Sequence, residues 1–361
     1  MNGIILKDRA VVARLRRDLL TWYDVHGRKL PWREGARDPY RVWLSEVMLQ
    51  QTTVPHAAPY YEKFLRLWPS ARDLAAAEDG RVMAEWAGLG YYARARKLLE
   101  CARTVVRDYD GIFPADEAEL LKLPGFGPYT SAAVTAIAFG HAANVVDGNI
   151  ERIMTRLYTV ETPMPAGKPQ VREAAAQWVS DDRAGDWPQA LMDMATLICR
   201  PKTPVCGECP LAKACLAKTR SEQERFPLKL TKAPKPRRYG VVFVILSGDS
   251  VVVERRADKG LLGGMLGLPH TEWRLVPYRS EEIVPPLSAA FETIGIYEHV
   301  FTHFALTQEV WRVQLSDEAL RDFLRHNNGF QLLPVNEKAL PTVFAKALKV
   351  KHVPVEPGLF D

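Results

Sequence analysis

The sequence predicts a multidomain α and α+β protein, in which an all-α domain precedes a smaller α/β domain. Three observations support this prediction. Residues 1–217 show helical spacing of apolar residues, residues 218–238 are rich in Pro, Lys and Arg, and residues 239–361 open with β-branched runs. The 361 residues fit two domains at about 100–200 residues each. We therefore expect domains over 1–217 and 239–361, joined by a basic linker over 218–238.

The helices of the first domain are predicted from their start signals and apolar spacing. Asp38 followed by Pro39 is a capping residue followed by a residue preorganised for the first helical turn. Asp116 starts a second helix, and Pro128 starts an Ala-rich third one. Apolar residues recur on one side of the segment 91–109, which indicates an amphipathic helix.

The second domain is predicted from a change in the pattern of apolar residues along the sequence. Residues 241–246 and 251–253 are apolar and mostly β-branched, and the turn-forming residues 247–250 separate them, which indicates two strands. Residues 310–315 form a further predicted strand, and Ser316 caps a helix behind it. Strands and a helix together indicate a mixed α/β domain.

Composition restricts the class of protein. Apolar residues make up 47% and charged residues 25%, close to the averages of globular proteins, which excludes a disulfide scaffold or a chain disordered as a whole. No stretch approaches the roughly 20 apolar residues that span a bilayer, and residues 1–17 contain no secretory signal. We therefore expect a cytoplasmic protein without a membrane partner. The formal charge of +5 is concentrated in residues 218–238, which contain eight Lys and Arg residues but only two Glu.

Four of the five cysteines, Cys199, Cys206, Cys209 and Cys215, follow the spacing Cys-x6-Cys-x2-Cys-x5-Cys. In a reducing compartment, clustered thiols favour metal ligation over disulfides. Four cysteines often bind a structural zinc ion, but zinc sites usually have two closely spaced pairs and only one pair here fits. A cubane iron–sulfur cluster also takes four thiolates. The spacing leaves both kinds of centre open.

A glycine-containing segment, Leu123–Tyr129, lies between two predicted helices. Gly125 and Gly127 allow backbone N–H groups to approach a ligand closely, and the helix that follows adds its positive end. Such a turn grips a phosphate backbone without reading sequence. An ordinary tight helix–helix turn has the same residues, so the segment alone does not decide between the two.

Two carboxylates have surroundings that suit acid–base chemistry. Glu46 lies on an apolar helix face, where desolvation favours the protonated form of a general acid, and the alternative is a rim residue paired with Arg41. Asp147 precedes another helix, where a helix cap formed by Asp147 or Asn149 is the simpler interpretation. Two carboxylates in different environments are also the arrangement that glycoside cleavage uses.

Four motifs occur in an informative order: Leu44–Thr52, Leu123–Gly127, Val146–Asn149 and the four-cysteine cluster. Together they closely resemble the adenine DNA glycosylases of the MutY family, and the similarity extends over the linker and the second domain. The endonuclease III relatives share the hairpin and the cluster, so these two motifs alone indicate only the superfamily. The resemblance implies an all-α helix-hairpin-helix glycosylase domain with a [4Fe-4S] cluster on the four cysteines. It also implies excision of adenine mispaired with 8-oxoguanine or guanine.

The resemblance assigns catalytic roles to four residues. Glu46 matches the acid that protonates the adenine ring, and Asp147 matches the carboxylate that stabilises the sugar cation or traps it covalently. Asn149 resembles the polar neighbour of that carboxylate. Tyr129 resembles a residue that shields the sugar, and it stands where lyases of the endonuclease III type carry a Lys nucleophile. Without an amine there, and with Glu151 where some members carry Lys, we expect a monofunctional hydrolase that is not readily trapped on DNA.

Further residues match positions that contact DNA bases in the family. Gln189 resembles a contact to the adenine edge, and Arg33 is a second candidate for such a contact. Gln51 and Tyr91 resemble side chains that wedge into the base stack beside 8-oxoguanine, because planar groups must fill the gap that an extruded base leaves. Ordinary packing is the alternative for both wedge residues.

The second domain resembles the nudix-like module of the same family through residues 260–265 and its strand pattern. A working nudix hydrolase needs a Glu-rich helix that holds magnesium. Glu281 and Glu282 are followed by Pro285 and Pro286, so neither the helix nor the remaining carboxylates are expected. The module should therefore bind rather than hydrolyse.

A loop of this module senses 8-oxoguanine in the family, and the matching residues here are Phe301, Thr302 and His303. Thr302 replaces a serine and keeps the hydroxyl, so a hydrogen bond to the lesion remains available. An ordinary strand end with His303 on the surface is the alternative. The basic residues 218–238 would then follow the DNA or tether the two domains around it.

Three functions compete. The first is an adenine glycosylase acting on double-stranded DNA with an A·8-oxoguanine mispair, as a monomer associated with the nucleoid. The second is another helix-hairpin-helix glycosylase that removes thymine from G·T pairs or oxidised pyrimidines, against which the second domain argues. The third is a non-catalytic iron–sulfur DNA-binding protein, against which the presence of both Glu46 and Asp147 argues. We favour the first.

Overall fold

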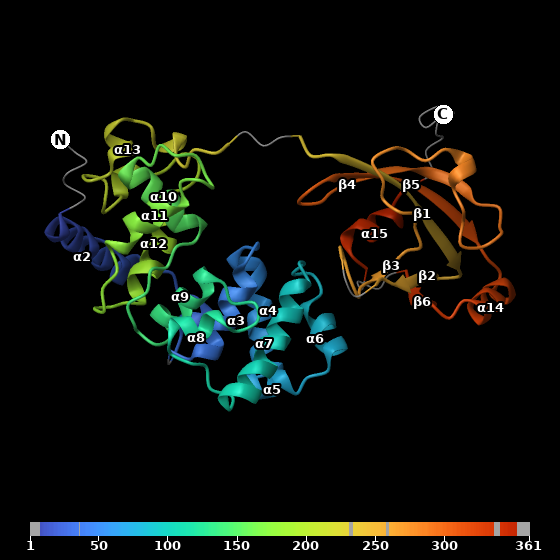
Figure 1. Ribbon diagram of the computed structural model, residues 1–361, viewed down its shortest axis with the longest axis horizontal. Coiled ribbons are helices and arrows are strands. Elements are labelled where there is room, and N and C mark those ends of the chain that lie inside the picture. The colour runs from blue at the N-terminus through green and yellow to red at the C-terminus, as the bar shows by residue number, and fades with distance from the viewer. Residues whose placement is uncertain (1–7, 36, 231–233, 258–259, 336–339, 352–361) are drawn as a thin grey trace. The chain divides into compact units, whose positions relative to one another are not determined.

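The computed structural model describes residues 8–35, 37–230, 234–257, 260–335 and 340–351. The chain divides into two compact units between residues 231 and 232, and each unit is described by itself. The first is helical and the second contains a sheet (Figure 1). None of the described helices is long and apolar enough to cross a membrane. The predicted fold class, an all-α part followed by an α/β part, is confirmed.

Sequence signals place the helix starts of the first unit. The Asp38 carboxylate accepts a hydrogen bond from Tyr40 N at 2.9 Å at the start of α3, and Asp116 caps α8 in the same way. Helix α9 begins at Pro128, as predicted. The helices of this unit are α2 (Arg9–His26), α3 (Pro39–Leu49), α4 (Val54–Leu67), α5 (Ala71–Ala75), α6 (Asp79–Trp86), α7 (Ala93–Tyr109), α8 (Glu117–Leu121), α9 (Pro128–Ile137), α10 (Gly148–Tyr158), α11 (Lys168–Ala176), α12 (Asp186–Leu197) and α13 (Leu216–Thr219).

Two apolar cores hold the first unit together. Helices α3 to α9 enclose the first core, which contains the buried rings of Trp43, Phe64 and Trp86. Helices α2, α10, α11 and α12 enclose the second core, which contains Trp178 and Trp187. Helix α9 contributes small residues to both cores. It therefore joins the core that contains α3 to the core that contains α10, the helices that carry or adjoin the predicted carboxylates.

The segment predicted as a basic linker is packed over part of its length. Phe226 is 1% exposed, and its carbonyl accepts a hydrogen bond from Arg156 Nε at 3.2 Å. Met164 N donates to Leu228 O at 2.8 Å. The residues up to 230 therefore belong to the first unit, and strand β1 of the second unit already begins at Arg237. The buried side chain of Phe226 anchors this segment despite its linker-like composition. The segment that joins the two units is therefore shorter than the predicted linker of 218–238.

The second unit is a mixed sheet with a helix on each face. The strand order is β3-β2-β1-β5-β4, with β6 also paired to β2; β1 and β5 are parallel and the other pairs are antiparallel. Alternate residues of β1 pack toward α14 (Asp317–His326) and toward α15 (Thr342–Ala347). The strands are β1 (Arg237–Ser247), β2 (Ser250–Arg255), β3 (Leu266–Gly267), β4 (Glu292–Val300), β5 (Ala305–Gln314) and β6 (Phe330–Pro334).

The strands and the helix predicted for this unit are present. A two-residue turn joins β1 to β2 with Ser247 opposite Ser250, and Ser316 caps α14 by accepting from Ala319 N at 3.3 Å. The prediction misses β3, β4, β6 and α15. Between β3 and β4, where a nudix hydrolase would carry its Glu-rich helix, the described residues include a short 3-10 turn, Ser280–Glu282, and no α-helix.

Candidate active site

Glu46 is a buried acid within α3. It is 7% exposed, and the Tyr129 hydroxyl donates a hydrogen bond to its Oε2. Burial raises the pKa of Glu46 to about 7; the hydrogen bond from Tyr129 opposes this rise, the charge of Asp147 adds to it, and the charge of Arg33 opposes it. Glu46 therefore keeps its proton to a higher pH than an exposed glutamate does. This side chain is not a rim residue, and its hydrogen-bond partner is Tyr129 instead of Arg41.

Tyr129 supports the acid from the first turn of α9. Burial raises the pKa of Tyr129 well above its usual value, and the nearby charges of Glu46 and Asp147 add to the rise. The hydroxyl therefore stays protonated and acts as the donor to Glu46. No amine stands at this position, so the pocket offers no Schiff-base nucleophile there.

Glu46 lines a cavity of about 50 Å³ on one side of α3. Arg33 and Gln189, the two predicted contacts to the adenine edge, line the same cavity, together with Arg28 and Trp32. An acid, an amide, two guanidinium groups and an indole are suited to holding a planar heterocycle by its edge and its face. The structure thus brings Glu46, Arg33 and Gln189 to one place.

Asp193 orders the two arginines of this cavity. Its side chain is completely buried, and it accepts from Arg28 Nε at 2.8 Å and from Arg33 Nη1 and Nη2 at 2.7 and 3.0 Å. One carboxylate thus fixes two cations, which leaves a positive charge beside Glu46. Sequence reasoning missed Arg28 and Asp193. The only signal was an acid among the apolar residues in the middle of helix α12, and its partners lie far away in the chain.

Asp147 is the capping residue of α10. Its Oδ1 accepts from Asn149 N at 3.0 Å and from Ile150 N at 2.7 Å, and Asn149 Nδ2 donates to its Oδ2 at 2.8 Å. The simpler sequence interpretation, a helix cap, is therefore present in the structure. This capping role does not exclude a catalytic role, because the charge of Asp147 also acts on Glu46 and Tyr129.

Asn149 is fixed from its other side by Arg152. Arg152 Nη2 donates to Asn149 Oδ1 at 3.2 Å, and its Nε donates to Cys199 O at 2.9 Å. The cap of α10 and the start of the cysteine segment therefore share one guanidinium. The sequence analysis did not identify Arg152 either, since nothing in the sequence connects this residue to Cys199.

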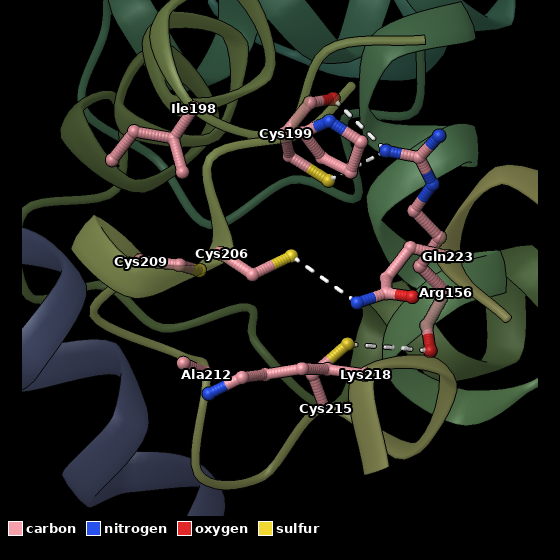
Figure 2. Close-up of a pocket in the computed structure, with 10 residues that line it drawn as sticks. Arg156, Ile198, Cys199, Cys206, Cys209, Ala212, Cys215, Lys218 and Gln223 are labelled. Atoms are coloured by element: carbon pink, nitrogen blue, oxygen red, sulfur yellow. Dashed lines mark hydrogen bonds between the residues drawn. The ribbon is translucent and has the colours of Figure 1, made fainter. Parts of the chain in front are cut away.

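The four cysteines line one cavity of about 30 Å³ (Figure 2). Arg156 Nη1 lies 3.3 Å from the sulfur of Cys199, and Gln223 Nε2 lies 3.6 Å from the sulfur of Cys206. Burial raises the pKa of the Cys209 thiol to about 12, so a thiolate there needs a cation to offset the cost of its charge.

The four cysteine thiols are candidate ligands of an inorganic centre, either a metal ion or a cluster. Among the described residues, no three His, Cys, Asp or Glu side chains are arranged to hold a single metal ion. A zinc ion needs its thiolates at about 2.3 Å, which pulls them tightly together. Four thiols that line one shared cavity supply the ligand number that either a zinc ion or a cubane iron–sulfur cluster takes.

Gln51 and Tyr91 lie on two loops outside the cavity, one after α3 and one before α7. Both are exposed, Tyr91 to 56%, so ordinary packing does not describe them. Both also adopt left-handed backbone conformations, with φ of 63° and 49°. Non-glycine residues rarely adopt such values outside turns and functional sites, where the surroundings enforce them.

The glycine hairpin joins α8 to α9. Gly125 has φ of +81°, and an added Cβ would meet Lys97 Cβ at 3.0 Å, so the turn itself requires this glycine. Gly127 has no such constraint: it caps α9, and an added Cβ would meet no atom within 4 Å. The open face beside Gly127 leaves room for a ligand backbone to approach.

In the second unit, Phe301, Thr302 and His303 form the turn between β4 and β5. Phe301 N donates to Phe304 O at 2.8 Å, and the Phe301 ring packs against Phe304 and Trp273. Thr302 and His303 are exposed at the tip. The aromatic residues anchor the turn, and the two polar residues are available to a partner.

The fold and these sites define a helix-hairpin-helix enzyme of base-excision DNA repair. Residues 44–181 match the family described as "HhH-GPD superfamily base excision DNA repair protein", and residues 241–350 match the NUDIX domain. A thermostable thymine-DNA glycosylase has a similar structure, with 31% identity, a TM-score of 0.54, and coverage of 58% of this chain and 97% of its own. An endonuclease III in a DNA complex has a TM-score of 0.51 over 59% of this chain and 98% of its own, but at 20% identity it supports the fold alone.

Curated relatives extend over both units. The human adenine DNA glycosylase is 32% identical over 87% of this chain and 69% of its own length. The rat adenine DNA glycosylase is 31% identical over 87% of this chain and 73% of its own, and the Arabidopsis thaliana enzyme is 35% identical over 80% and 55%. The chain belongs to the adenine DNA glycosylase family. This confirms the resemblance and the prediction of a DNA N-glycosylase, and it does not favour the two competing functions.

Proposed function

We propose that this protein excises adenine mispaired with 8-oxoguanine, or with guanine, from double-stranded DNA by hydrolysing the N-glycosidic bond without cutting the strand. The observation that carries the proposal is the buried Glu46, whose pKa is raised by burial, in a cavity that Arg33 and Gln189 also line, with the charge of Asp147 close enough to act on it. A non-catalytic DNA-binding protein has no use for an acid whose ionisation is made this costly.

In the proposed mechanism the extruded adenine enters the cavity and receives the Glu46 proton on a ring nitrogen. The bond between C1′ and the base breaks, and its electron pair leaves with the now neutral base. The Asp147 carboxylate, oriented by three donors, offsets the positive charge that develops on the sugar. Water then adds its hydroxyl to C1′, and its remaining proton restores the acid form of Glu46.

The proposed roles of other residues follow from their positions. Arg33 and Gln189 hold the edge of the base, Asn149 keeps Asp147 in orientation, and Tyr129 covers the acid. Gly125 and Gly127 admit the DNA backbone at the hairpin. Gln51 and Tyr91 enter the base stack from their exposed loops. Phe301, Thr302 and His303 present a polar turn to 8-oxoguanine.

We propose a [4Fe-4S] cluster on Cys199, Cys206, Cys209 and Cys215, because these four thiols line one cavity and their spacing in the sequence has only one of the two close pairs that zinc sites usually show. When bound, the cluster supplies a rigid anchor for the loop of residues 199–215. No step of the reaction needs it. A single copy of the chain supplies every residue named, so we propose that it acts as a monomer at the nucleoid.

The test is a single-turnover excision assay on a duplex with one A·8-oxoguanine pair, with G·T and thymine-glycol duplexes in parallel. Strand breaks that appear only after alkali, and only in the adenine strand of the first duplex, support the proposal. Glu46→Gln should abolish excision and keep DNA binding, while the exposed matched control Glu62→Gln should act like the wild type. Breaks without alkali, or activity confined to the other duplexes, would refute it.

A further inference from the structure

The loops that carry Gln51 and Tyr91 are connected by one side chain, Arg94, in the first turn of α7. Arg94 Nη1 donates to Val47 O at 2.8 Å and to Met48 O at 3.2 Å, in the last turn of α3. The carbonyls in the last turn of a helix lack partners within that helix, so these bonds satisfy groups that would otherwise need water. The residues that follow this turn lead directly to Gln51.

The other arm of the same guanidinium reaches the second loop. Arg94 Nη2 donates to Leu89 O at 3.2 Å and to Gly90 O at 3.4 Å, the two residues before Tyr91. The Arg94 guanidinium also lies over the Tyr91 ring, 5.6 Å from its centre. One planar fork thus spans both loops, which a single ammonium group is unable to do.

The Tyr91 loop is held in the same manner at its earlier residues. Tyr60 Oη donates to Ala87 O at 2.9 Å, and His56 Nε2 lies at hydrogen-bond distance, 3.2 Å, from Gly88 O. Both partners come from α4. The loop is therefore fixed in its left-handed conformation before any ligand is present, and Arg94 is the group that ties this fixed loop to the end of α3.

We propose that Arg94 is a positioning residue that fixes Gln51 and Tyr91 relative to each other, so that the two side chains enter the base stack as one rigid unit. This inference rests on the proposed function, because it gives the wedge residues a common support. Arg94 lines no part of the Glu46 cavity. Its loss should therefore slow extrusion of the base and leave bond cleavage in the cavity unchanged.

The test compares Arg94→Lys with Arg103→Lys. Arg103, on the same helix, also forks onto two carbonyls, Ala75 O at 3.2 Å and Ala77 O at 3.0 Å, but it contacts neither loop. With 2-aminopurine as the target base, the rise in fluorescence reports extrusion. We expect Arg94→Lys to slow this rise and single-turnover excision about tenfold, and Arg103→Lys to change both less than twofold. The pH midpoint of excision should not move in either variant.

A purely structural role for Arg94 predicts a different pattern, which a combined variant reveals. If Arg94 acts through the wedge, Arg94→Lys should add less than a twofold loss to the double variant Gln51→Ala/Tyr91→Ala. A full tenfold loss in that background, or unchanged extrusion in Arg94→Lys alone, would overturn the proposal. Wild-type protein that extrudes 2-aminopurine but excises no adenine would instead refute the proposed function.

A folding defect is distinguished by a second variant. If Arg94→Lys melts below the assay temperature, His56→Ala/Tyr60→Phe removes two other supports of the Tyr91 loop while keeping Arg94. Slower extrusion with an unchanged pH midpoint is the expected result. Extrusion at the wild-type rate by a folded His56→Ala/Tyr60→Phe protein would show that the loop needs no such support, and the proposal would fail.

Discussion

Replacing Glu46 by Gln should make the protein more stable at alkaline pH, although it removes the proposed acid. The amide of Gln keeps the shape of the side chain and an oxygen that accepts from Tyr129, but it has no charge. The pKa of Glu46 rises from 4.5 to about 7 on folding. Since a raised acid pKa means that the folded state resists ionisation, the wild-type protein carries a cost that the variant lacks.

The sign and size of this cost follow from the pKa. Below pH 4.5 Glu46 is protonated in both the folded and the unfolded chain, so no cost arises. The cost grows between pH 4.5 and pH 7, where the unfolded chain has lost the proton of Glu46 and the folded protein still holds it, and it reaches its full value above pH 7. At about 1.4 kcal/mol per pKa unit, it amounts to about 3 kcal/mol above pH 7. Because Glu46 is buried, little of this is screened by solvent.

Urea unfolding of the two proteins at pH 4.5 and pH 8 measures this difference. At pH 8 the free energy of unfolding of Glu46→Gln should exceed that of the wild type by about 3 kcal/mol, an increase of about 1 M or more in the urea midpoint. The two midpoints should nearly coincide at pH 4.5. The exposed control Glu62→Gln should change neither. Equal stabilisation at both pH values, or none at pH 8, would refute the reasoning about Glu46.

Four further outcomes are expected. Tyr129→Phe removes a hydrogen bond that lowers the pKa of Glu46, so the alkaline limb of the excision profile should move to higher pH, and a downward move would contradict this. Asp147→Asn should reduce the single-turnover excision rate by about a hundredfold or more while duplex binding, measured by gel shift, persists; near-normal rates would remove Asp147 from the mechanism. Arg152→Gln should reduce excision about tenfold with unchanged iron content per chain, whereas loss of iron would place its role in the cysteine segment. His303→Ala should lower the preference for 8-oxoguanine over guanine about fivefold, and an unchanged preference would count against lesion sensing by the β4–β5 turn.

Local signals in the sequence account for much of the fold. A capping Asp before a Pro, as at Asp38, and a two-residue turn between β-branched runs, as at 247–250, are decided by neighbouring residues. Strand β4 was missed because it lies at the sheet edge, where only part of one face is buried and Gly295 interrupts the alternation. The packed part of the predicted linker was missed because a single anchor, Phe226, is invisible in average composition.

The residues of the candidate site also fall into two groups, those with a local signal in the sequence and those without one. Glu46 and Asp147 were found because each lies in a short motif. Arg28, Arg94, Arg152 and Asp193 were not, since each acts through partners far away in the chain or through backbone carbonyls, which have no sequence signature. The motifs therefore identify the reacting groups, and the three-dimensional structure adds the groups that hold them.

The different roles of the two carboxylates follow from where each lies on its helix. Glu46 lies within α3, where the backbone N–H groups are already used in the helix, so burial is not offset by backbone donors and the proton is retained. Asp147 lies at the start of α10, where the first N–H groups lack partners and two of them bind its carboxylate. Helix α9 brings the middle of one helix to the end of another, and one site thereby gains both a proton donor and an oriented anion. A buried pair with two equal environments would offer neither, because the two groups would share their protons.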